Sequence, residues 1–256
     1  MRTRLSVAVT GALISLGLAV AGCSGSATPS QTSTLTIYAA ASMQTTFDTL
    51  KTTFEAEHPG TTVMLNYAGS QALATQLVEG ATADVFVSAN DTQMKVVTDA
   101  GLNAADPRVF ATNQLQIAVP PSNPAAISTF ADLTKPEVKL VVCAPAVPCG
   151  AATVKVEKAT GVTLTPVSEE QAVTSVLSKV QAGEADAGLV YKTDVIAAGD
   201  TVTGIEFPES SEAINRNPVV LLKSAPQGEL GQAWIDLLFS EQGQQVFADA
   251  GFGAAQ

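Results

Sequence analysis

The fold is indicated first by one stretch near the N-terminus, Thr34-Leu-Thr-Ile-Tyr-Ala-Ala-Ala-Ser-Met-Gln-Thr-Thr-Phe-Asp-Thr-Leu-Lys51. Residues 35–39 are typical of a buried strand, and residues 43–57 have the spacing of a helix. Three alanines join the two, and Ser42 stands at the junction. The stretch predicts a βα unit with a hydroxyl group at the carboxyl end of its strand.

The same alternation of strand and helix continues outward from this stretch, and it indicates an α/β fold in which mostly parallel sheets are flanked by helices. A second series of βα units begins near residue 139, after a proline-rich segment. The predicted strands are 35–39, 62–67, 85–88, 115–119, 139–143, 163–167, 187–191 and 219–222, and the predicted helices are 43–57, 70–79, 91–100, 150–160, 170–182, 228–239 and 241–250.

Two series of βα units predict two lobes rather than one long sheet. We expect the chain to pass between the lobes at the strands 115–119 and 219–222. The first lobe then contains residues 34–113 and 217–256, and the second contains residues 114–216. Two lobes joined by two extended segments form a hinge with a cleft between them.

Composition limits the classes of partner. The chain has 256 residues, of which 46% are hydrophobic and 14% are charged, so it can bury a substantial core. Its formal net charge is −11, and no basic residues are clustered. This balance argues against nucleic acid or an anionic membrane surface as a partner. Any anion must therefore be held by local hydrogen-bond donors.

The N-terminus has the pattern of a lipoprotein signal peptide over residues 1–22. Arg2 and Arg4 precede an apolar run that ends in Val20-Ala-Gly-Cys23. A lipid on Cys23 would anchor the exported protein to the outer face of the cytoplasmic membrane. Residues 23–33 are small and polar and predict a flexible tether. The alternative is an uncleaved membrane helix, which no block of charge follows.

Two further cysteines, Cys143 and Cys149, enclose Ala-Pro-Ala-Val-Pro. In an exported chain this spacing predicts a disulfide. Closing such a short loop stabilises a protein by roughly 2 kcal/mol in the chain-entropy account. The alternative is a pair of unrelated buried thiols.

Three strand-to-helix junctions carry candidate anion donors. Ser42 and Ser70 lie at the first two junctions, and Pro148-Cys149-Gly150 precedes the first helix of the second series. Free amide groups at helix N-termini bind anions, and ligands of open α/β sheets collect at the carboxyl ends of the strands. Each serine alone could instead be a simple helix cap.

Five segments, in order along the chain, resemble the periplasmic molybdate-binding proteins of ABC transporters. The segment from Gly183 to Asp194 is the most specific of them, and Ala-Ala-Ser alone is weak. The segments are Tyr38-Ala-Ala-Ala-Ser-Met43, Ala68-Gly-Ser-Gln-Ala-Leu-Ala-Thr-Gln-Leu77, Ala83-Asp-Val-Phe-Val-Ser-Ala89, Val147-Pro-Cys-Gly150 and Gly183-Glu-Ala-Asp-Ala-Gly-Leu-Val-Tyr-Lys-Thr-Asp194.

The resemblance implies a two-lobed type II periplasmic binding protein that holds a tetrahedral oxyanion in the interlobe cleft. It implies ligand contacts from Ser42 and Ser70 of the first lobe, from the backbone amides of Cys149 and Val173 of the second, and from the Tyr191 phenol. Cys149 stands where that family commonly has a small residue such as alanine, which an amide contact tolerates.

One local pattern conflicts with this set of contacts. Ser168-Glu-Glu-Gln171 has the form of a capping box, which would start the helix before Val173 and place the Val173 amide in a helical bond.

The resemblance also implies partners. We expect capture of molybdate or tungstate without any cofactor, delivery to an ABC transporter permease, and a monomeric protein. Molybdate is an unprotonated dianion, so a site made only of donors suits it, whereas monohydrogen phosphate would leave a polar contact unmatched. Sulfate, phosphate or an organic anion in the same two-lobed fold is the alternative ligand.

An enzyme is the alternative of a different class. A serine hydrolase needs a base, and the single histidine, His58, lies in a turn after a helix. No nucleophile-elbow motif and no cluster with metal-ligand spacing occurs. We interpret Asp84, Asp186 and Asp194 as strand-end or capping residues, although Asp84 and Asp186 could instead ligate a cation.

Overall fold

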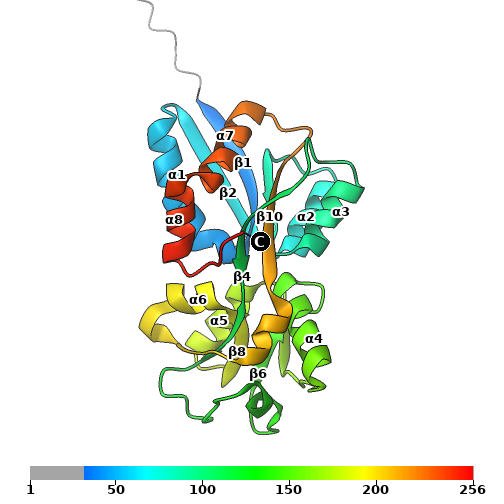
Figure 1. Cartoon of the computed structure of the whole chain (residues 1–256), viewed down its shortest axis with the longest axis vertical. Helices are drawn as coiled ribbons and strands as arrows, with labels where there is room; N and C mark the ends of the chain where they lie inside the picture. Colours follow the sequence, from blue (N-terminus) through cyan, green and yellow to red (C-terminus); the bar gives the residue numbers. More distant parts are fainter. Residues whose placement is uncertain (1–31, 256) are drawn as a thin grey trace, which may run out of the picture. The chain divides into compact units, whose positions relative to one another are not determined.

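The computed structural model describes residues 32–255, which form two α/β halves, each built on its own five-stranded sheet (Figure 1). The predicted signal peptide, the lipidation site Cys23 and the predicted tether up to Gln31 lie outside the described residues. The first strand begins at Ser33, one residue before the folded part was expected.

The first sheet has the strand order β2-β1-β3-β10-β4. β1 pairs in parallel with β2 and β3, whereas β10 is antiparallel to both of its neighbours, β3 and β4. The strands are β1 (Ser33–Ala40), β2 (Thr61–Ala68), β3 (Val85–Val87), β4 (Arg108–Asn113) and β10 (Asn215–Leu221).

The second sheet has the order β7-β6-β8-β5-β9 and repeats the topology of the first. β6 pairs in parallel with β7 and β8, and β5 is antiparallel to β8 and β9. The strands are β5 (Leu115–Val119), β6 (Leu140–Cys143), β7 (Ser168–Glu170), β8 (Ala187–Tyr191) and β9 (Thr203–Ile205).

The parallel βα units were predicted correctly, but both sheets are mixed. One strand of each sheet, β10 or β5, runs against the other four because it enters that half from the opposite half of the molecule. Local periodicity does not report strand direction, so no sequence pattern indicated these reversals.

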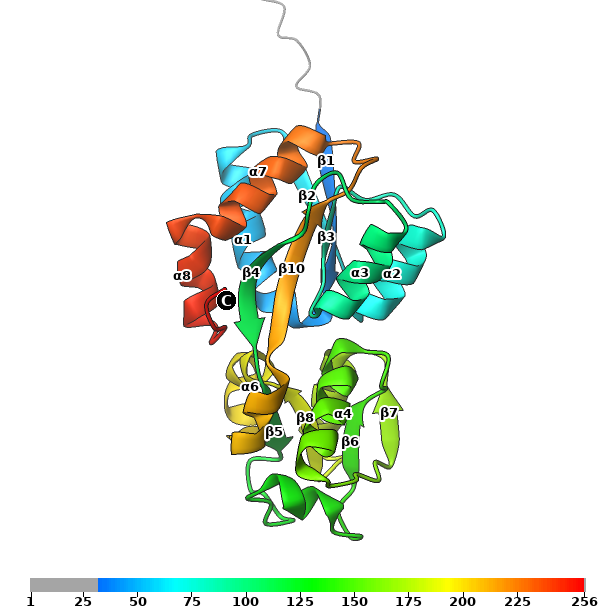
Figure 2. The same cartoon turned by 45° about the vertical axis from the view of Figure 1, so that its right-hand side comes forward.

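Helices cover both faces of each sheet (Figures 1 and 2). In the first half the Trp234 ring packs edge-on against Phe47 and Phe54 of α1, with centroids 5.4 Å apart in both pairs. The first half contains η1 (Ala41–Met43), α1 (Gln44–Glu57), α2 (Ser70–Val78), α3 (Asp91–Asp99), α7 (Gly228–Phe239) and α8 (Glu241–Asp249). The second contains η2 (Phe130–Thr134), α4 (Pro148–Thr160), α5 (Val173–Gln181), α6 (Lys192–Ala198), η3 (Gly199–Thr201) and η4 (Pro208–Ala213).

Two connections join the halves, as Figure 2 shows where β4 leads into β5 and where η4 leads into β10. The first connection is Gln114 alone, between β4 and β5, and the second is Ile214, between η4 and β10. The predicted lobe limits, 34–113 with 217–256 and 114–216, remain a prediction. The strands themselves place Asn215 and Arg216 in the first sheet.

Several local predictions were wrong. The predicted strand 163–167 is displaced to β7 at 168–170, and the predicted helix 170–182 begins only at Val173. Two strands and one α-helix were not predicted, namely β4, β9 and α6. β4 and β9 lie at the edges of the sheets, where pairing with the reversed strand stabilises a segment that lacks a strong strand pattern of its own.

Candidate oxyanion-binding site

The five residues that the sequence singled out lie around one small cavity between the two halves. These residues come from five different strand ends, three of which belong to the second half. The cavity is lined by Ala40, Ala41, Ser42, Ala68, Gly69, Ser70, Ala89, Val147, Pro148, Cys149, Val173 and Tyr191. None of these residues carries a charge at neutral pH, so every polar contact that the cavity offers is made by a neutral group.

The two serines differ in how the protein uses their hydroxyl groups. The buried Ser42 Oγ has no hydrogen-bond partner among the described residues. The Ser70 Oγ accepts a bond from the Ala89 amide at 3.0 Å, and its own hydrogen is given to no acceptor in residues 32–255. Both hydroxyls therefore keep a donor available to a ligand. Leaving such a buried group unmatched costs about 1–3 kcal/mol, so Ser42 indicates that something polar binds beside it.

Two helix N-termini of the second half line the cavity, through Cys149 and Val173. Cys149 is in the first turn of α4, which Val147 caps without a side-chain bond. Val173 is the first residue of α5, and Ala172 caps that helix, again without a side-chain bond. Amides in a first helical turn have no partner within the helix, and the helix dipole adds positive potential there.

The capping box predicted at Ser168 is therefore absent. Residues Ser168–Glu170 pair with β6 as β7, and the Ser168 hydroxyl bonds to the Glu170 carboxylate instead of a helix amide. Lys179 of α5 forms an ion pair with the same carboxylate at 2.6 Å. Because the helix starts after this strand, the Val173 amide is free of the helical bond that the capping box would have imposed.

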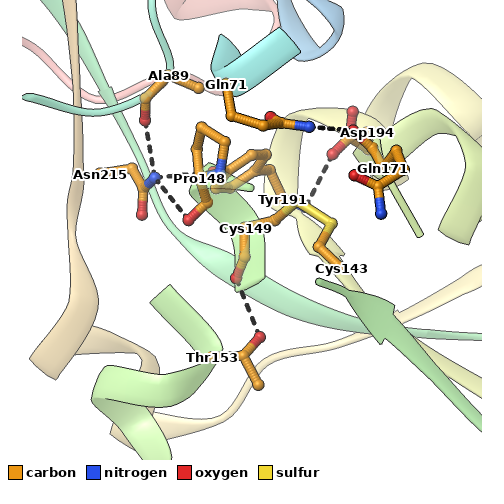
Figure 3. The surroundings of a disulfide bond; sticks show 10 residues. All are labelled: Gln71, Ala89, Cys143, Pro148, Cys149, Thr153, Gln171, Tyr191, Asp194 and Asn215. Carbon is orange, nitrogen blue, oxygen red and sulfur yellow. Dashed lines mark hydrogen bonds between the residues drawn. A yellow bond between two sulfur atoms is a disulfide. The ribbon is translucent and has the colours of Figure 1, made fainter. Parts of the chain in front are cut away.

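Tyr191 is buried at the end of β8 and carries the phenol on the cavity wall. Burial raises the pKa of this phenol well above its usual value, and the nearby Asp194 raises it further, whereas a hydrogen bond from Asn215 opposes the shift. The Asn215 Nδ2 atom donates to the Tyr191 oxygen at 2.8 Å (Figure 3). The phenol thus stays protonated and can donate its hydrogen.

Asp194 lies behind Tyr191 and does not line the cavity. Its Oδ2 atom accepts a bond from the Tyr191 amide at 2.8 Å and caps α6. Burial raises the pKa of this carboxyl to about 7, although the amide bond opposes the shift. The expectation that Asp194 is a capping residue is confirmed, and the cavity lining has no carboxylate.

The predicted disulfide between Cys143 and Cys149 is present and joins the end of β6 to the first turn of α4 (Figure 3). The Cα atoms of the pair are 5.7 Å apart. Gly150 follows, and a Cβ atom there would overlap the Ala144 carbonyl oxygen, so only glycine allows this turn to pack. The bridge and the close packing together hold the Cys149 amide in place.

Side-chain amides of the first half reach carbonyl groups beside the helix N-termini of the second. The Gln71 Nε2 atom donates to the Gln171 carbonyl at 2.9 Å, and the Gln93 Nε2 atom donates to the Ala146 carbonyl at 2.9 Å. A Cβ atom at Gly69 would overlap the Gln171 carbonyl oxygen. The two halves are therefore in a closed arrangement around the cavity.

Sequence reasoning missed Asn215, Gln71 and Gln93. Gln71 follows Ser70 in a quoted motif, but nothing local indicates that its side chain crosses to the other half. Asn215 lies in Ile214-Asn-Arg-Asn-Pro218, which matches no motif. The Asn215 side chain finds its partners, Ala89 and Tyr191, only because β10 lies beside the ends of β3 and β8 in the folded protein.

The acidic residues considered as cation ligands have structural partners. The Asp84 carboxylate accepts bonds from the amides of Thr36, at 2.7 Å, and Gln227, at 2.6 Å. Asp186 accepts a bond from the Lys139 amide at 2.8 Å. Within residues 32–255 no group of three or more His, Cys, Asp or Glu residues is placed to hold a metal ion.

His58 lies away from the cavity. It caps the end of α1 and packs against Phe54, with the rings tilted by 34° and their centroids 4.1 Å apart. A larger groove of about 560 Å³ shares Ser42 with the cavity, but its walls are mostly apolar and threonine side chains of α1, α5, α6 and α8. Ser70, Cys149, Val173 and Tyr191 do not line that groove.

The chain matches the family model described as "Bacterial extracellular solute-binding protein" over residues 35–253. The chain belongs to this family. Members named "Molybdate-binding protein ModA" from Mycobacterium bovis and Mycobacterium tuberculosis are 43% identical to it, over 97% of this chain and 97% of theirs. A Bacillus subtilis relative with the words "substrate-binding lipoprotein" in its name is 31% identical over 93% of this chain and 94% of its own.

Solved structures support the fold. The periplasmic molybdate-binding protein of Azotobacter vinelandii superposes with a TM-score of 0.76 at 19% identity, covering 87% of this chain and 100% of that one. A likeness at this identity concerns the fold alone, and it confirms the two-lobed α/β architecture expected from the sequence. None of the helices in residues 32–255 is long and apolar enough to cross a bilayer.

Proposed function

We propose that this protein is an extracytoplasmic solute-binding protein that captures molybdate, and tungstate equally, for an ABC transporter permease. One observation carries the proposal: the cavity gathers neutral donors from both halves, and the Ser42 hydroxyl among them has no partner within the described residues. The 43% identity to mycobacterial proteins named for molybdate binding agrees with it.

The ligand contacts proposed are the hydroxyls of Ser42, Ser70 and Tyr191 and the amides of Cys149 and Val173. All of them can donate a hydrogen bond, and no lining residue offers a carboxylate, which could only accept one. A fully deprotonated tetrahedral dianion satisfies every one of them. A protonated anion would either face a donor with its own hydrogen or require a hydroxyl to turn and accept it, so the complex would lose at least one donor bond to the ligand.

Neutral donors suffice energetically. Hydrogen bonds to a charged group contribute roughly 1.5–3 kcal/mol each, so about five of them match or exceed the roughly 8–12 kcal/mol of a micromolar to nanomolar complex. Part of this sum offsets the cost of desolvating the ligand and of closing the lobes. The helix N-termini of α4 and α5 add favourable potential for an anion although the protein is acidic overall.

The lipid anchor, the permease partner and the monomeric state are also proposals. The lipobox at Cys23 and a relative named as a lipoprotein support a lipid anchor on the outer face of the cytoplasmic membrane. The role in transport makes a permease the protein partner. We further propose that the protein acts as a monomer, because one chain supplies all of the donors.

The proposal is tested by calorimetric titration of the purified protein with molybdate, tungstate, sulfate and phosphate. We expect saturable binding of the first two oxyanions. Ser42→Ala should weaken molybdate binding by about 10-fold without loss of stability, because the hydroxyl has no partner among residues 32–255. Ser70 is a poorer choice for the test, since its removal would also orphan the Ala89 amide.

Ser240→Ala is the matched control for Ser42→Ala. The Ser240 hydroxyl caps α8 by accepting from the Gly243 amide at 3.0 Å. Its loss should cost about 1 kcal/mol of stability and leave affinity unchanged. Saturation by sulfate or phosphate but not molybdate would instead support the alternative anion, and turnover of a chromogenic ester would support a hydrolase. Unchanged molybdate affinity in Ser42→Ala would remove Ser42 from the site.

A further inference from the structure

Asn215 is a buried carboxamide at the start of β10, where the chain returns from the second half to the first. Its Nδ2 atom lies 2.7 Å from the Ala89 carbonyl oxygen, 2.8 Å from the Tyr191 hydroxyl and 3.5 Å from the Pro148 carbonyl oxygen. Figure 3 shows the amide nitrogen facing all three of these oxygens. Asn215 is thus bonded to the first half through Ala89 and to the second half through Tyr191.

These partners fix the direction of the bond to Tyr191. Carbonyl oxygens only accept hydrogen bonds, so the Asn215 nitrogen, not its oxygen, must face Ala89 and Pro148. The same nitrogen then donates to the Tyr191 oxygen. The phenol cannot give its hydrogen back to that nitrogen, and no other acceptor for it occurs in the described residues. Its hydrogen is left for the cavity.

We propose that Asn215 is a positioning residue, which holds the Tyr191 hydroxyl as an obligatory donor to the bound oxyanion and thereby selects against protonated anions. This inference rests on the proposed function. A tyrosine hydroxyl free to rotate could accept a hydrogen from monohydrogen phosphate as readily as it donates to molybdate. With Asn215 in place, the rotation that would turn a lone pair to the ligand is blocked, because the Asn215 hydrogen occupies that side of the oxygen.

A double-mutant cycle in the full-length protein tests this role, with calorimetric molybdate affinity as the readout. We expect Tyr191→Phe and Asn215→Ala each to weaken binding by about 10-fold. If Asn215 acts through the phenol, the double variant should bind no more than about 3-fold more weakly than Tyr191→Phe alone. The ratio of phosphate to molybdate dissociation constants should also fall in Asn215→Ala but not in Tyr191→Phe.

Gln93→Ala is the matched control, because it also removes a carboxamide bond between the halves but does not contact Tyr191. Its effect on molybdate affinity should add to that of Tyr191→Phe, and its ratio of phosphate to molybdate dissociation constants should stay at the wild-type value. If Asn215 contributed only to closure of the halves, Asn215→Ala would give the same result as Gln93→Ala: an additive loss of molybdate affinity and an unchanged anion ratio.

Asn215→Asp keeps the experiment decisive if Asn215→Ala does not fold. The aspartate has nearly the same shape, but its carboxylate would accept the Tyr191 hydrogen and could donate to neither the Ala89 nor the Pro148 carbonyl. Molybdate affinity should therefore fall further than in Tyr191→Phe. Additive losses with an unchanged anion ratio would overturn the inference and leave the proposed function intact. A wild-type protein that binds neither molybdate nor tungstate would overturn both.

Discussion

Burial sets the protonation of the two ionisable residues at the end of β8, Tyr191 and Asp194. It raises the pKa of the Tyr191 phenol and so keeps it protonated, as a donor requires. It also raises the pKa of Asp194 to about 7, although this carboxylate accepts the Tyr191 amide. A partly protonated Asp194 repels a dianion in the adjacent cavity less strongly than a fully ionised one. Burial thus favours anion binding through both residues.

Asp194 predicts an unusual dependence of stability on pH. Its pKa rises from an ordinary value of about 3.9 in the unfolded chain to about 7 in the folded protein. The folded state therefore binds more protons between these two pKa values, and stability is lost as pH rises through this window. Relative to Asp194→Asn, the wild-type free energy of unfolding should fall from about pH 4 to about pH 7, by up to roughly 1.4 kcal/mol per pH unit.

Urea unfolding at a series of pH values measures this difference. Asp106→Asn is the control, since it removes the same charge from an exposed side chain and should give a curve parallel to that of the wild type. Parallel curves for Asp194→Asn as well would show that the buried carboxyl does not titrate in this range.

At the scale of elements, the site is built from the ends of strands and the starts of helices. Ser42 follows β1 and Ser70 follows β2, while Cys149 and Val173 stand after β6 and β7, the corresponding strands of the second sheet. Local sequence places a donor at each junction. Local sequence predicted the start of α5 less accurately, because the residues that resembled a capping box belong to the strand β7.

The disulfide at the α4 junction predicts a link between redox state and binding. Replacing both Cys143 and Cys149 by alanine keeps the amide at position 149 but opens the ring that holds it. We expect a loss of about 2 kcal/mol of stability and weaker molybdate binding. Urea unfolding and calorimetry, each with and without reductant, measure both effects.

Reductant supplies the internal control for this prediction. It should bring the wild type to the stability of the double variant and should leave the variant itself unchanged. If the wild type without reductant and the double variant unfolded at the same urea midpoint, the prediction would be contradicted.

At the scale of the whole molecule, the two halves share one topology and face each other with equivalent strand ends. Asp84 and Asp186 show this repetition. Each directly precedes the central strand of its sheet, β3 or β8, and accepts an amide from the neighbouring strand β1 (Thr36) or from the residue before β6 (Lys139). Closure then brings the donors of both halves around one ligand. The close approach of Gly69 to the Gln171 carbonyl marks the point where the halves meet.

Gly69→Ala should therefore impair closure while each half still folds. The added methyl group would overlap the backbone carbonyl oxygen of Gln171 in the opposite half, and separation of the halves relieves that overlap. We expect molybdate affinity to fall by at least about 10-fold with little change in the thermal stability of the protein without ligand. Calorimetry gives the affinity, and small-angle scattering with and without molybdate reports closure.

Gly228→Ala is the control for Gly69→Ala, because a Cβ atom at that position meets no atom within 4 Å. It should bind and close as the wild type does. Normal molybdate affinity in Gly69→Ala would mean that the closed contact between Gly69 and Gln171 is not needed for binding.

The sequence by itself determined the βα units, the cysteine pair that forms the disulfide, and the junctions that carry Ser42, Ser70 and Cys149, because hydrophobic period, cysteine spacing and strand-to-helix transitions are local properties. Only the tertiary structure decided the reversed strands β5 and β10, the start of α5 at Val173, the unpaired state of the Ser42 hydroxyl within residues 32–255 and the bond from Asn215 to Tyr191. These features depend on contacts between segments far apart in the chain. No local pattern encodes such contacts, because each becomes favourable only when the two halves pack together.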